Sequence, residues 1–380
     1  TAGGNPRNDV IDYFTMATTG NAVDFGDLPA NDVFGSGLAS TTRGLIKDGT
    51  DTDNSISFVT ISTTGDAVDY GDLTVARGTH VQTSANATRV IFASGRTPSA
   101  NNTIEFVTIA TLGNSAEFGD LTRTTAESNA GAANPTRAIF MGNGTSNGDT
   151  IDLIEISTRG NATDFGNLAA AKHFTTGGVS NSIRGAHGGS STDPATLNVI
   201  EFVTIASTGN STNFGDMTDH RRLGASFSSS TRGIMAGGLT PSRVNTIDFV
   251  EMSTKGNAND FGDTNELLAS ELNGISNGIR GVYIGGQDGS SNISEIIQTV
   301  TISSKGNASK FGELTNKRRS TGTCSNSTRG VFAAGYNGGS GLTSIEFITI
   351  SSEGNGTDFG DLAMDTSFAT SVSNSIRGVF

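Results

Sequence analysis

The chain has 380 residues, a formal net charge of −13 and 34% hydrophobic residues, with no tryptophan and a single cysteine. An acidic surface repels nucleic acid and anionic membranes, so neither is expected as a partner. The sequence has no run of 18 apolar residues, which argues against membrane insertion, and one cysteine excludes an internal disulfide framework. The 51 glycines, set beside evenly spaced runs of Ile, Val and Phe, favour repetitive β-structure over disorder.

Eight copies of one sequence element run through the chain. The element is Gly, Asn or Asp, two small residues, usually an acid, an aromatic residue, Gly, and then usually an acid and Leu. A repeat spaced by 45 to 50 residues is typical of propellers and solenoids. The copies begin at Gly20, Gly65, Gly113, Gly160, Gly209, Gly256, Gly306 and Gly354.

Each repeat unit predicts four strands in chain order. The first is rich in small residues, as in 320–324, and the second begins with an arginine and ends in glycine, as in 232–238. The third has apolar residues on both faces, as in 104–109, which suits a sheet packed between two neighbours. The fourth is short and carries the aromatic residue, as in 163–168. The arginines of the second strands are Arg43, Arg89, Arg137, Arg184, Arg232, Arg280, Arg329 and Arg377.

These units predict an all-β fold, a single eight-bladed β-propeller domain over residues 1–380 with four antiparallel strands in each blade. Residues 376–380, followed by residues 1–4, spell one complete second strand. We therefore expect the N- and C-terminal strands to share a blade and close the ring, which removes open sheet edges. A linear solenoid would need distinct capping repeats, and the sequence has none.

The aromatic residues of the repeated element have two interpretations. They could form a stacking platform for sugars, or each could fill the gap between adjacent blades in place of the absent tryptophans. Recurrence in every unit favours the structural role. Neighbouring acids, such as Asp24 and Asp27, are likewise expected to cap turns or pair with the repeated arginines rather than to act as catalytic or metal-binding pairs. The aromatic residues are Phe25, Tyr70, Phe118, Phe165, Phe214, Phe261, Phe311 and Phe359.

Few residues outside the repeated elements suggest a catalytic or metal-binding role. Asp48, Asp51 and Asp53 have a spacing loosely like that of a calcium loop, but no Glu closes the loop at its twelfth position. The four histidines share no metal-ligand spacing, and Cys324 occupies a slot that small residues hold in several other units. We therefore predict no catalytic residue, no metal site and no cofactor, and a protein that is not an enzyme.

The order of the elements resembles the kelch repeat across essentially the whole chain. Glycine pairs end the second strand at Gly237-Gly238 and Gly285-Gly286, and an aromatic residue lies in the fourth strand. The tryptophan usual in that family is Phe or Tyr here, and the tyrosine of its third strand is mostly absent. The resemblance implies a divergent kelch-like propeller.

A second resemblance, to virion-associated proteins of marine tailed phages and of cyanophages in particular, covers all eight repeats. The matching stretches include residues 230–238, 245–250 and 256–263. This resemblance implies a non-enzymatic virion component of a tail, neck or fibre, which contacts other virion proteins and mediates adhesion to the host surface. No catalytic residue transfers with it, and the oligomeric state stays open.

Two other functions are consistent with the same fold. One is a bacterial surface or secreted propeller that binds carbohydrate. The other is a kelch-type copper radical oxidase, which would need a Tyr–Cys crosslink and histidine ligands. Tyr13, Tyr70, Tyr283 and Tyr336 show no paired placement with Cys324 and the histidines, so the oxidase is disfavoured.

The loops predict which side of the ring contacts a partner. Turns between first and second strands and between third and fourth strands barely change from unit to unit, and we call their side the constant face. Loops between second and third strands vary in length and chemistry, at 48–54, 96–102, 190–198 and 287–294. They share their side, the variable face, with the segments that join the units. Because loops can vary on a rigid scaffold without harming the fold, we predict that the variable face binds a virion protein or an anionic host glycan. The expected contact residues are Lys172, His173, His220, Arg221, Arg222, Lys317, Arg318 and Arg319.

Overall fold

The structure is a computed structural model whose described residues are 8–15, 23–32, 36–40, 42–47, 53–77, 81–97, 99–125, 130–141, 148–169, 177–181, 183–191, 196–222, 224–240, 242–265, 273–288, 290, 292–366, 372–373 and 377–379. The regular elements in these ranges are strands. None of the described residues forms a helix long and apolar enough to cross a membrane.

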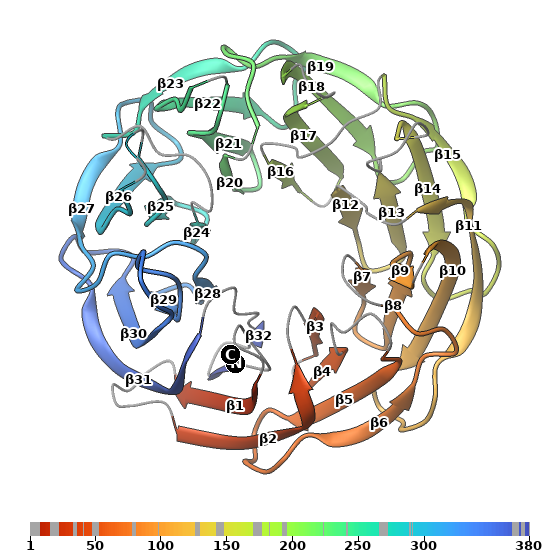
Figure 1. Ribbon diagram of the computed structural model, residues 1–380. Coiled ribbons are helices and arrows are strands. Elements are labelled where there is room, and N and C mark those ends of the chain that lie inside the picture. Colours follow the sequence, from red (N-terminus) through yellow and green to blue (C-terminus); the bar gives the residue numbers. More distant parts are fainter. Residues whose placement is uncertain are drawn as a thin grey trace.

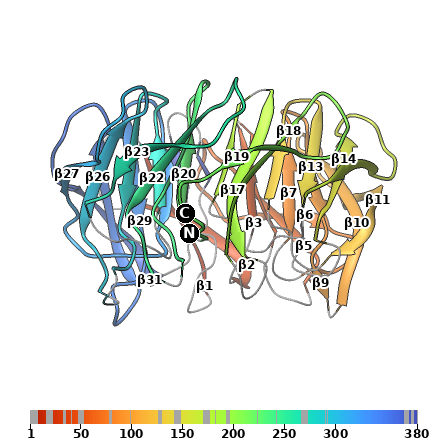
Figure 2. The same ribbon diagram turned by 90° about the horizontal axis from the view of Figure 1, so that it is seen from above.

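The strands form antiparallel sheets that stand side by side in a ring, as Figure 1 shows face-on and Figure 2 from the edge. This arrangement is a β-propeller, and each sheet is one blade. Seven sheets have four strands each. The remaining sheet has five, because the short strand β9 (Arg96–Thr97) pairs with the extended N-terminal part of β10. The prediction of eight blades with four strands each is therefore wrong, because seven blades have four strands.

Within a blade, strands follow one another from the inside of the ring outwards. The first strands are β3 (Ser36–Ala39), β7 (Gln82–Ala85), β12 (Ala130–Ala133), β16 (Gly177–Ser180), β20 (Ala225–Ser228), β24 (Asn273–Ser276), β28 (Gly322–Ser325) and β32 (Val372–Ser373). The second strands are β4 (Arg43–Lys47), β8 (Arg89–Ala93), β13 (Arg137–Met141), β17 (Arg184–Ser191), β21 (Arg232–Ala236), β25 (Arg280–Ile284), β29 (Arg329–Ala333) and β33 (Arg377–Val379). The third strands are β1 (Asn8–Thr15), β5 (Ser55–Thr60), β10 (Ser99–Thr108), β14 (Thr150–Glu155), β18 (Thr196–Thr204), β22 (Thr246–Glu251), β26 (Ile296–Thr301) and β30 (Leu342–Thr349). The fourth strands are β2 (Val23–Asp32), β6 (Val68–Asp72), β11 (Ala116–Thr125), β15 (Thr163–Asn167), β19 (Thr212–Asp216), β23 (Asn259–Asp263), β27 (Ser309–Glu313) and β31 (Thr357–Thr366).

The two ends of the chain meet in a way that corrects the sequence-based expectation. We predicted one second strand that runs through residues 376–380 and on into residues 1–4. In the structure the three-residue strand β33 lies antiparallel beside β1, with Tyr13 opposite Val379 and Thr15 opposite Arg377. The described contact between the ends is thus lateral pairing of two separate strands, in the sheet order β2-β1-β33-β32. The predicted junction itself falls on residues 380 and 1–7, outside the described residues.

Apolar side chains on both faces of each blade make the core. In β8, Val90 and Phe92 lie in one cluster with residues of the preceding blade. Ile91 and Ala93, which alternate with them, lie in another cluster with residues of the next blade. All four are at most 2% exposed. Alternation along a strand sends successive side chains to opposite faces, so a continuous apolar run is what a blade between two neighbours requires.

The aromatic residues of the repeated element are part of these interfaces. Phe118, for example, lies in one cluster with Ile154 and Ile156 of the next blade. In six blades a third-strand ring meets the fourth-strand ring edge to face, with ring centres 5.5 to 5.9 Å apart. Burial leaves no surface for a stacking platform. The rings with 2–3% exposure are Phe25, Tyr70, Phe118, Phe165, Phe214, Phe261, Phe311 and Phe359.

In the described blades, the Gly-Asn or Gly-Asp turn between third and fourth strands packs on the outer strand of the blade before it. The Gly160 N–H donates to the Phe118 carbonyl at 2.9 Å, and Asn161 Oδ1 accepts from the Asp120 N–H at 3.1 Å. Gly119 lies directly beneath this turn with a φ of +155°, and a Cβ there would come within 2.4 Å of the Gly160 oxygen. The two halves of the repeated element therefore depend on each other across a blade interface.

The arginines that open the second strands also join blades. Arg43 Nη1 donates to the Ile109 carbonyl of the next blade at 2.7 Å, and Arg89 Nη1 donates to the Ile156 carbonyl at 2.8 Å. The guanidinium carbon of Arg89 lies 4.6 Å from the centre of the Phe106 ring. These contacts explain why the position is an arginine, whose flat guanidinium can stack and donate at once.

Candidate functional site

The variable face is built from two sets of loops that contact each other. The segment after β19 pairs with the second-to-third loop of the next blade, because the Arg222 N–H donates to the Leu239 carbonyl and the Leu239 N–H donates back. The same exchange joins Arg319 and Tyr336 after β27. Backbone hydrogen bonds thus fix the loops of this face against one another.

Two of the predicted contact residues are buried beneath this face, which corrects the sequence-based expectation. Arg221 and Arg318 are 0% exposed. Arg221 Nη2 lies 2.9 Å from Asp248 Oδ2, in the third strand of the next blade, and Arg318 binds Glu346 in the same way. An unpaired charge is too costly to bury, so these arginines are held inward by their carboxylates and do not reach a partner.

Equivalent buried pairs occur at two more interfaces, and the sequence analysis missed them. Arg77 Nη2 lies 2.8 Å from Glu105 Oε2, with both side chains fully buried, and Arg77 Nη1 donates to the Ser94 carbonyl at 2.6 Å. Arg123 Nε lies 3.5 Å from Asp152 Oδ2. The signal was present in the sequence, as an acid inside the apolar third strand of each blade with such a pair and an arginine five or seven residues after the aromatic residue of the preceding blade.

Burial dominates the electrostatics of these pairs. Loss of hydration lowers the pKa of Arg221 and Arg318, although the neighbouring carboxylates act in the opposite direction. Loss of hydration likewise raises the pKa of Asp152 and Asp248, against the hydrogen bonds and arginines that favour their charged forms. The pairs are structural joints between blades, with no opening to a substrate.

The other predicted contact residues are spread over the variable face. His220 and Lys317 are exposed, and Arg222 and Arg319 are half-buried. The Arg319 guanidinium carbon lies 5.1 Å from the centre of the Tyr336 ring. Lys172 and His173 lie outside the described residues. Of the expected basic residues that the structure describes, Arg221 and Arg318 are therefore withdrawn from the surface, and His220, Arg222, Lys317 and Arg319 are at least partly exposed.

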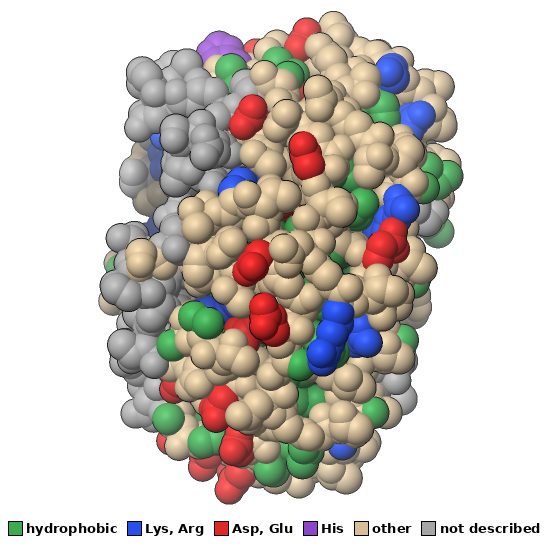
Figure 3. All heavy atoms as spheres, turned by 90° about the vertical axis from the view of Figure 1, so that its right-hand side faces the viewer, with side chains coloured by type: hydrophobic (Ala, Val, Ile, Leu, Met, Phe, Trp, Pro, Cys, Tyr) green, Lys and Arg blue, Asp and Glu red, His purple; other side chains and the backbone are tan. Residues whose placement is uncertain are grey.

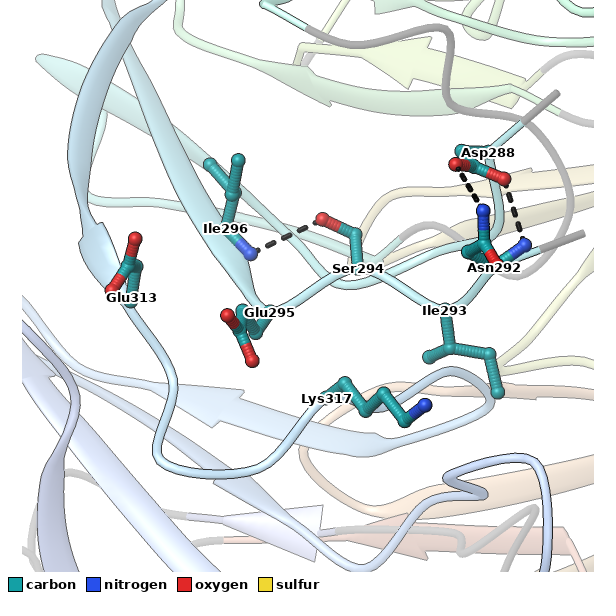
Figure 4. Close-up of a pocket in the computed structure, with 8 residues that line it drawn as sticks. All are labelled: Asp288, Asn292, Ile293, Ser294, Glu295, Ile296, Glu313 and Lys317. Carbon is teal, nitrogen blue, oxygen red and sulfur yellow. Dashed lines mark hydrogen bonds between the residues drawn. The ribbon is translucent and has the colours of Figure 1, made fainter. Parts of the chain in front are cut away.

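Lys317 lines a pocket of about 350 Å³ on the variable face. Figure 4 shows Asp288 and Asn292 at one end, Glu295 and Glu313 toward the other, and Lys317 along one side. The walls come from the loop between β25 and β26, the end of β27 and the segment leading to β28.

Hydrogen bonds fix the acidic end of this pocket. Asp288 Oδ1 accepts from the N–H groups of Ser290 and Asn292 at 2.9 and 2.7 Å, and Asp288 Oδ2 accepts from Asn292 Nδ2 at 3.0 Å. These bonds, first of all those from Asn292, hold the pKa of Asp288 below its usual value. Glu313 is bound at 2.5 Å by Lys310, outside the pocket lining. The pocket is a set of oriented hydrogen-bond acceptors with one ammonium group.

The structure describes only some of the candidate metal-binding and nucleophilic residues. Within these ranges, no group of three or more His, Cys, Asp and Glu side chains is arranged to hold a metal ion. Of the suggested calcium loop, Asp48 and Asp51 lie outside the described residues. Cys324 is 6% exposed, and burial raises the pKa of its thiol to about 12, so the thiolate form is suppressed at neutral pH. On the side of the ring seen in Figure 3, the described residues show scattered acidic and basic side chains and no broad hydrophobic patch.

Comparison with a solved structure supports the propeller fold. A computationally designed protein named Ika8 is similar with a TM-score of 0.63 and 12% sequence identity, over 94% of this chain and 98% of that one. A protein named YjhT has a TM-score of 0.49 and 10% identity, over 74% of this chain and 98% of that one. At such low identity the likeness to Ika8 shows the fold alone. No family model and no curated protein sequence matches the chain, so its resemblance to kelch repeats and phage proteins stays a prediction.

Proposed function

We propose that the protein is a non-enzymatic component of a phage virion, and that its variable face binds a neighbouring virion protein. The observation that carries this proposal is the contrast between the two faces. Near-identical Gly-Asn turns join the blades on the constant face, whereas the variable face presents loops of different length and chemistry on the same rigid ring. Recognition surfaces are commonly built in this way.

The charges on the variable face favour a protein partner over an anionic glycan. With Arg221 and Arg318 buried, the pocket beside β26 offers Asp288, Glu295 and Glu313 against the single cation of Lys317. A partner that places lysine or arginine side chains here would be attracted, and a polyanion would be repelled. The sequence resemblance to virion proteins of marine phages supports the assignment to a virion.

Purified particles of the encoding phage test this function. After nuclease treatment and density-gradient purification, mass spectrometry should recover peptides of this chain in a constant ratio to the major capsid protein. Recovery only from the soluble fraction of the lysate would overturn the virion assignment. The alternative function, a secreted or surface propeller that binds carbohydrate, predicts recovery from the soluble fraction instead.

A matched pair of variants tests the face. Lys317→Glu reverses the one cation of the pocket on the variable face, and Lys255→Glu makes the same change on the constant face, where Lys255 Nζ lies 5.3 Å from the centre of the Phe202 ring. We expect Lys317→Glu to change incorporation into particles and Lys255→Glu to leave it unchanged. The opposite pattern would place the contact on the constant face.

A further inference from the structure

One of the arginines that open second strands departs from the pattern of its repeats. Arg280 opens β25 and reaches the next blade through a long contact, 3.4 Å from Nη1 to the Ile350 carbonyl. The corresponding distance is 3.0 Å for Arg232 in the preceding blade. The distance is 2.7 to 3.2 Å for Arg43, Arg89, Arg137 and Arg184.

Arg280 also lacks the partners that its equivalents have. In most described blades the arginine lies over a third-strand phenylalanine, with 4.4 to 4.9 Å from the guanidinium carbon to the ring centre. In the blade where Leu153 replaces that ring, Glu155 binds Arg137 at 2.5 Å. In β26 the ring position is occupied by Thr299. Among the arginines of this series whose side chains the structure describes, Arg280 is the one with neither a ring nor a carboxylate as partner.

A pocket of about 160 Å³ on the constant face occupies the space beside Arg280 and Thr299. Its charged groups are Arg280, Lys305 and Glu353, which leave a net positive charge. Hydroxyl and amide side chains complete much of the lining, from Thr299, Thr301, Ser304, Ser309 and Asn307. The pocket is smaller than the roughly 300–1,000 Å³ that drug-sized ligands require, so it has room for one small unit.

We propose that this pocket binds a carboxylate-bearing sugar unit, with the carboxylate on the guanidinium of Arg280. A guanidinium presents paired N–H donors that match the two oxygens of a carboxylate. The surrounding hydroxyl and amide groups supply both donors and acceptors, as the hydroxyls of a sugar require. This site lies on the constant face and does not depend on the partner proposed for the variable face.

Calorimetric titration with sodium glucuronate tests the site, with glucose and sodium acetate as separate probes. Wild-type protein should bind glucuronate saturably and at least tenfold more tightly than either control, because glucose lacks the carboxylate and acetate lacks the hydroxyls. Thr299→Phe restores the ring found in other blades and fills the pocket, and it should weaken glucuronate binding at least tenfold. Arg280→Gln should do the same without adding bulk.

The matched control is Arg232→Gln in the preceding blade. Arg232 already has the Phe249 ring at 4.7 Å and Glu251 at 2.6 Å, so this variant should bind glucuronate like the wild type. No saturable binding to the wild type, or equal affinity for acetate, overturns the proposal. Undiminished binding by a folded Arg280→Gln variant also overturns it, whatever Thr299→Phe does to folding.

Discussion

Replacing Arg318 by serine is predicted to destabilise the ring because it leaves a buried carboxylate without its counter-ion. Arg318 Nη1 donates to the Ala334 and Ser344 carbonyls at 3.1 Å each, and Nη2 binds the Ser344 hydroxyl at 2.9 Å and the Glu346 carboxylate. Glu346 is itself 0% exposed and accepts from the Thr315 N–H at 2.7 Å. A further bond runs from Arg318 Nε to the Asn316 carbonyl at 3.4 Å, so the variant removes the cation and four further hydrogen bonds from a buried site.

Breaking a buried ion pair from one side costs roughly 3–5 kcal/mol. Unfolding entropy near the melting temperature is about 2.1 cal/mol/K per residue, or about 0.8 kcal/mol/K for 380 residues. Arg318→Ser should therefore lower the melting temperature by about 4–6 °C in scanning calorimetry. The neighbouring variant Arg319→Ser is the control, since it removes a half-buried side chain stacked on Tyr336, and should cost about 1 kcal/mol and about 1 °C.

Two results would refute this reasoning. One is an Arg318→Ser melting temperature within about 1 °C of the wild type, which would mean that the charge of Glu346 is hydrated or carried elsewhere. The other concerns the double variant Arg318→Ser/Glu346→Gln, in which the uncompensated charge is removed. It should be more stable than Arg318→Ser alone, and a double variant that is less stable would show that the charge is not the cause.

Three further predictions concern the blade interfaces. Phe165→Ala should cost about 3–5 kcal/mol in denaturant melts, because the ring is 2% exposed, and a loss below about 1 kcal/mol would contradict its role in packing. Gly215→Ala would place a Cβ 2.3 Å from the Gly256 oxygen and should lower the free energy of unfolding by more than about 2 kcal/mol. In Gly354→Ala the new Cβ meets nothing within 4 Å, so the loss should be less than about 1 kcal/mol. Equal losses in the two variants would refute the packing argument. Burial raises the pKa of Asp248 above its ordinary value, so the folded chain binds a proton at this carboxylate more readily than the unfolded chain does. As the pH falls from neutral toward 3.8, the wild type should therefore gain stability relative to Asp248→Asn. Melting curves in which the wild type instead loses stability relative to this variant would contradict the prediction.

The repeated features of the fold could be predicted because each is written many times in the sequence. Recurring aromatic residues such as Phe118 identified inter-blade packing, and the small residues of the first strands placed those strands nearest the axis. The fifth strand β9 could not be predicted, because it belongs to one variable loop and no other unit repeats its pairing. The pairing of β1 with β33 involves both ends of the chain, so no internal copy of the repeat specifies its details.

The candidate site was harder to predict because it depends on single residues rather than on the repeat. Arg221 and Arg222 are adjacent in the sequence, yet one is fully buried and the other half-exposed, since consecutive side chains of an extended segment point to opposite sides. The acid that holds Arg221 inward, Asp248, is 27 residues away in the next blade. Thr299 lines the pocket beside Arg280. Its importance becomes clear only in the structure, where it takes the position that a phenylalanine ring fills in other blades.

Chemical cross-linking of intact particles tests the central claim, that the variable face is the side bound to a partner. Lys317 marks the variable face, and Lys255 and Lys305, in the Gly-Asn turns of their blades, mark the constant face; all three are exposed. With an amine-reactive cross-linker and mass spectrometry, we predict links from Lys317 to a second virion protein, and none to that protein from Lys255 or Lys305. Links to a second protein from Lys255 or Lys305, with Lys317 reacting only with solvent, would contradict the account.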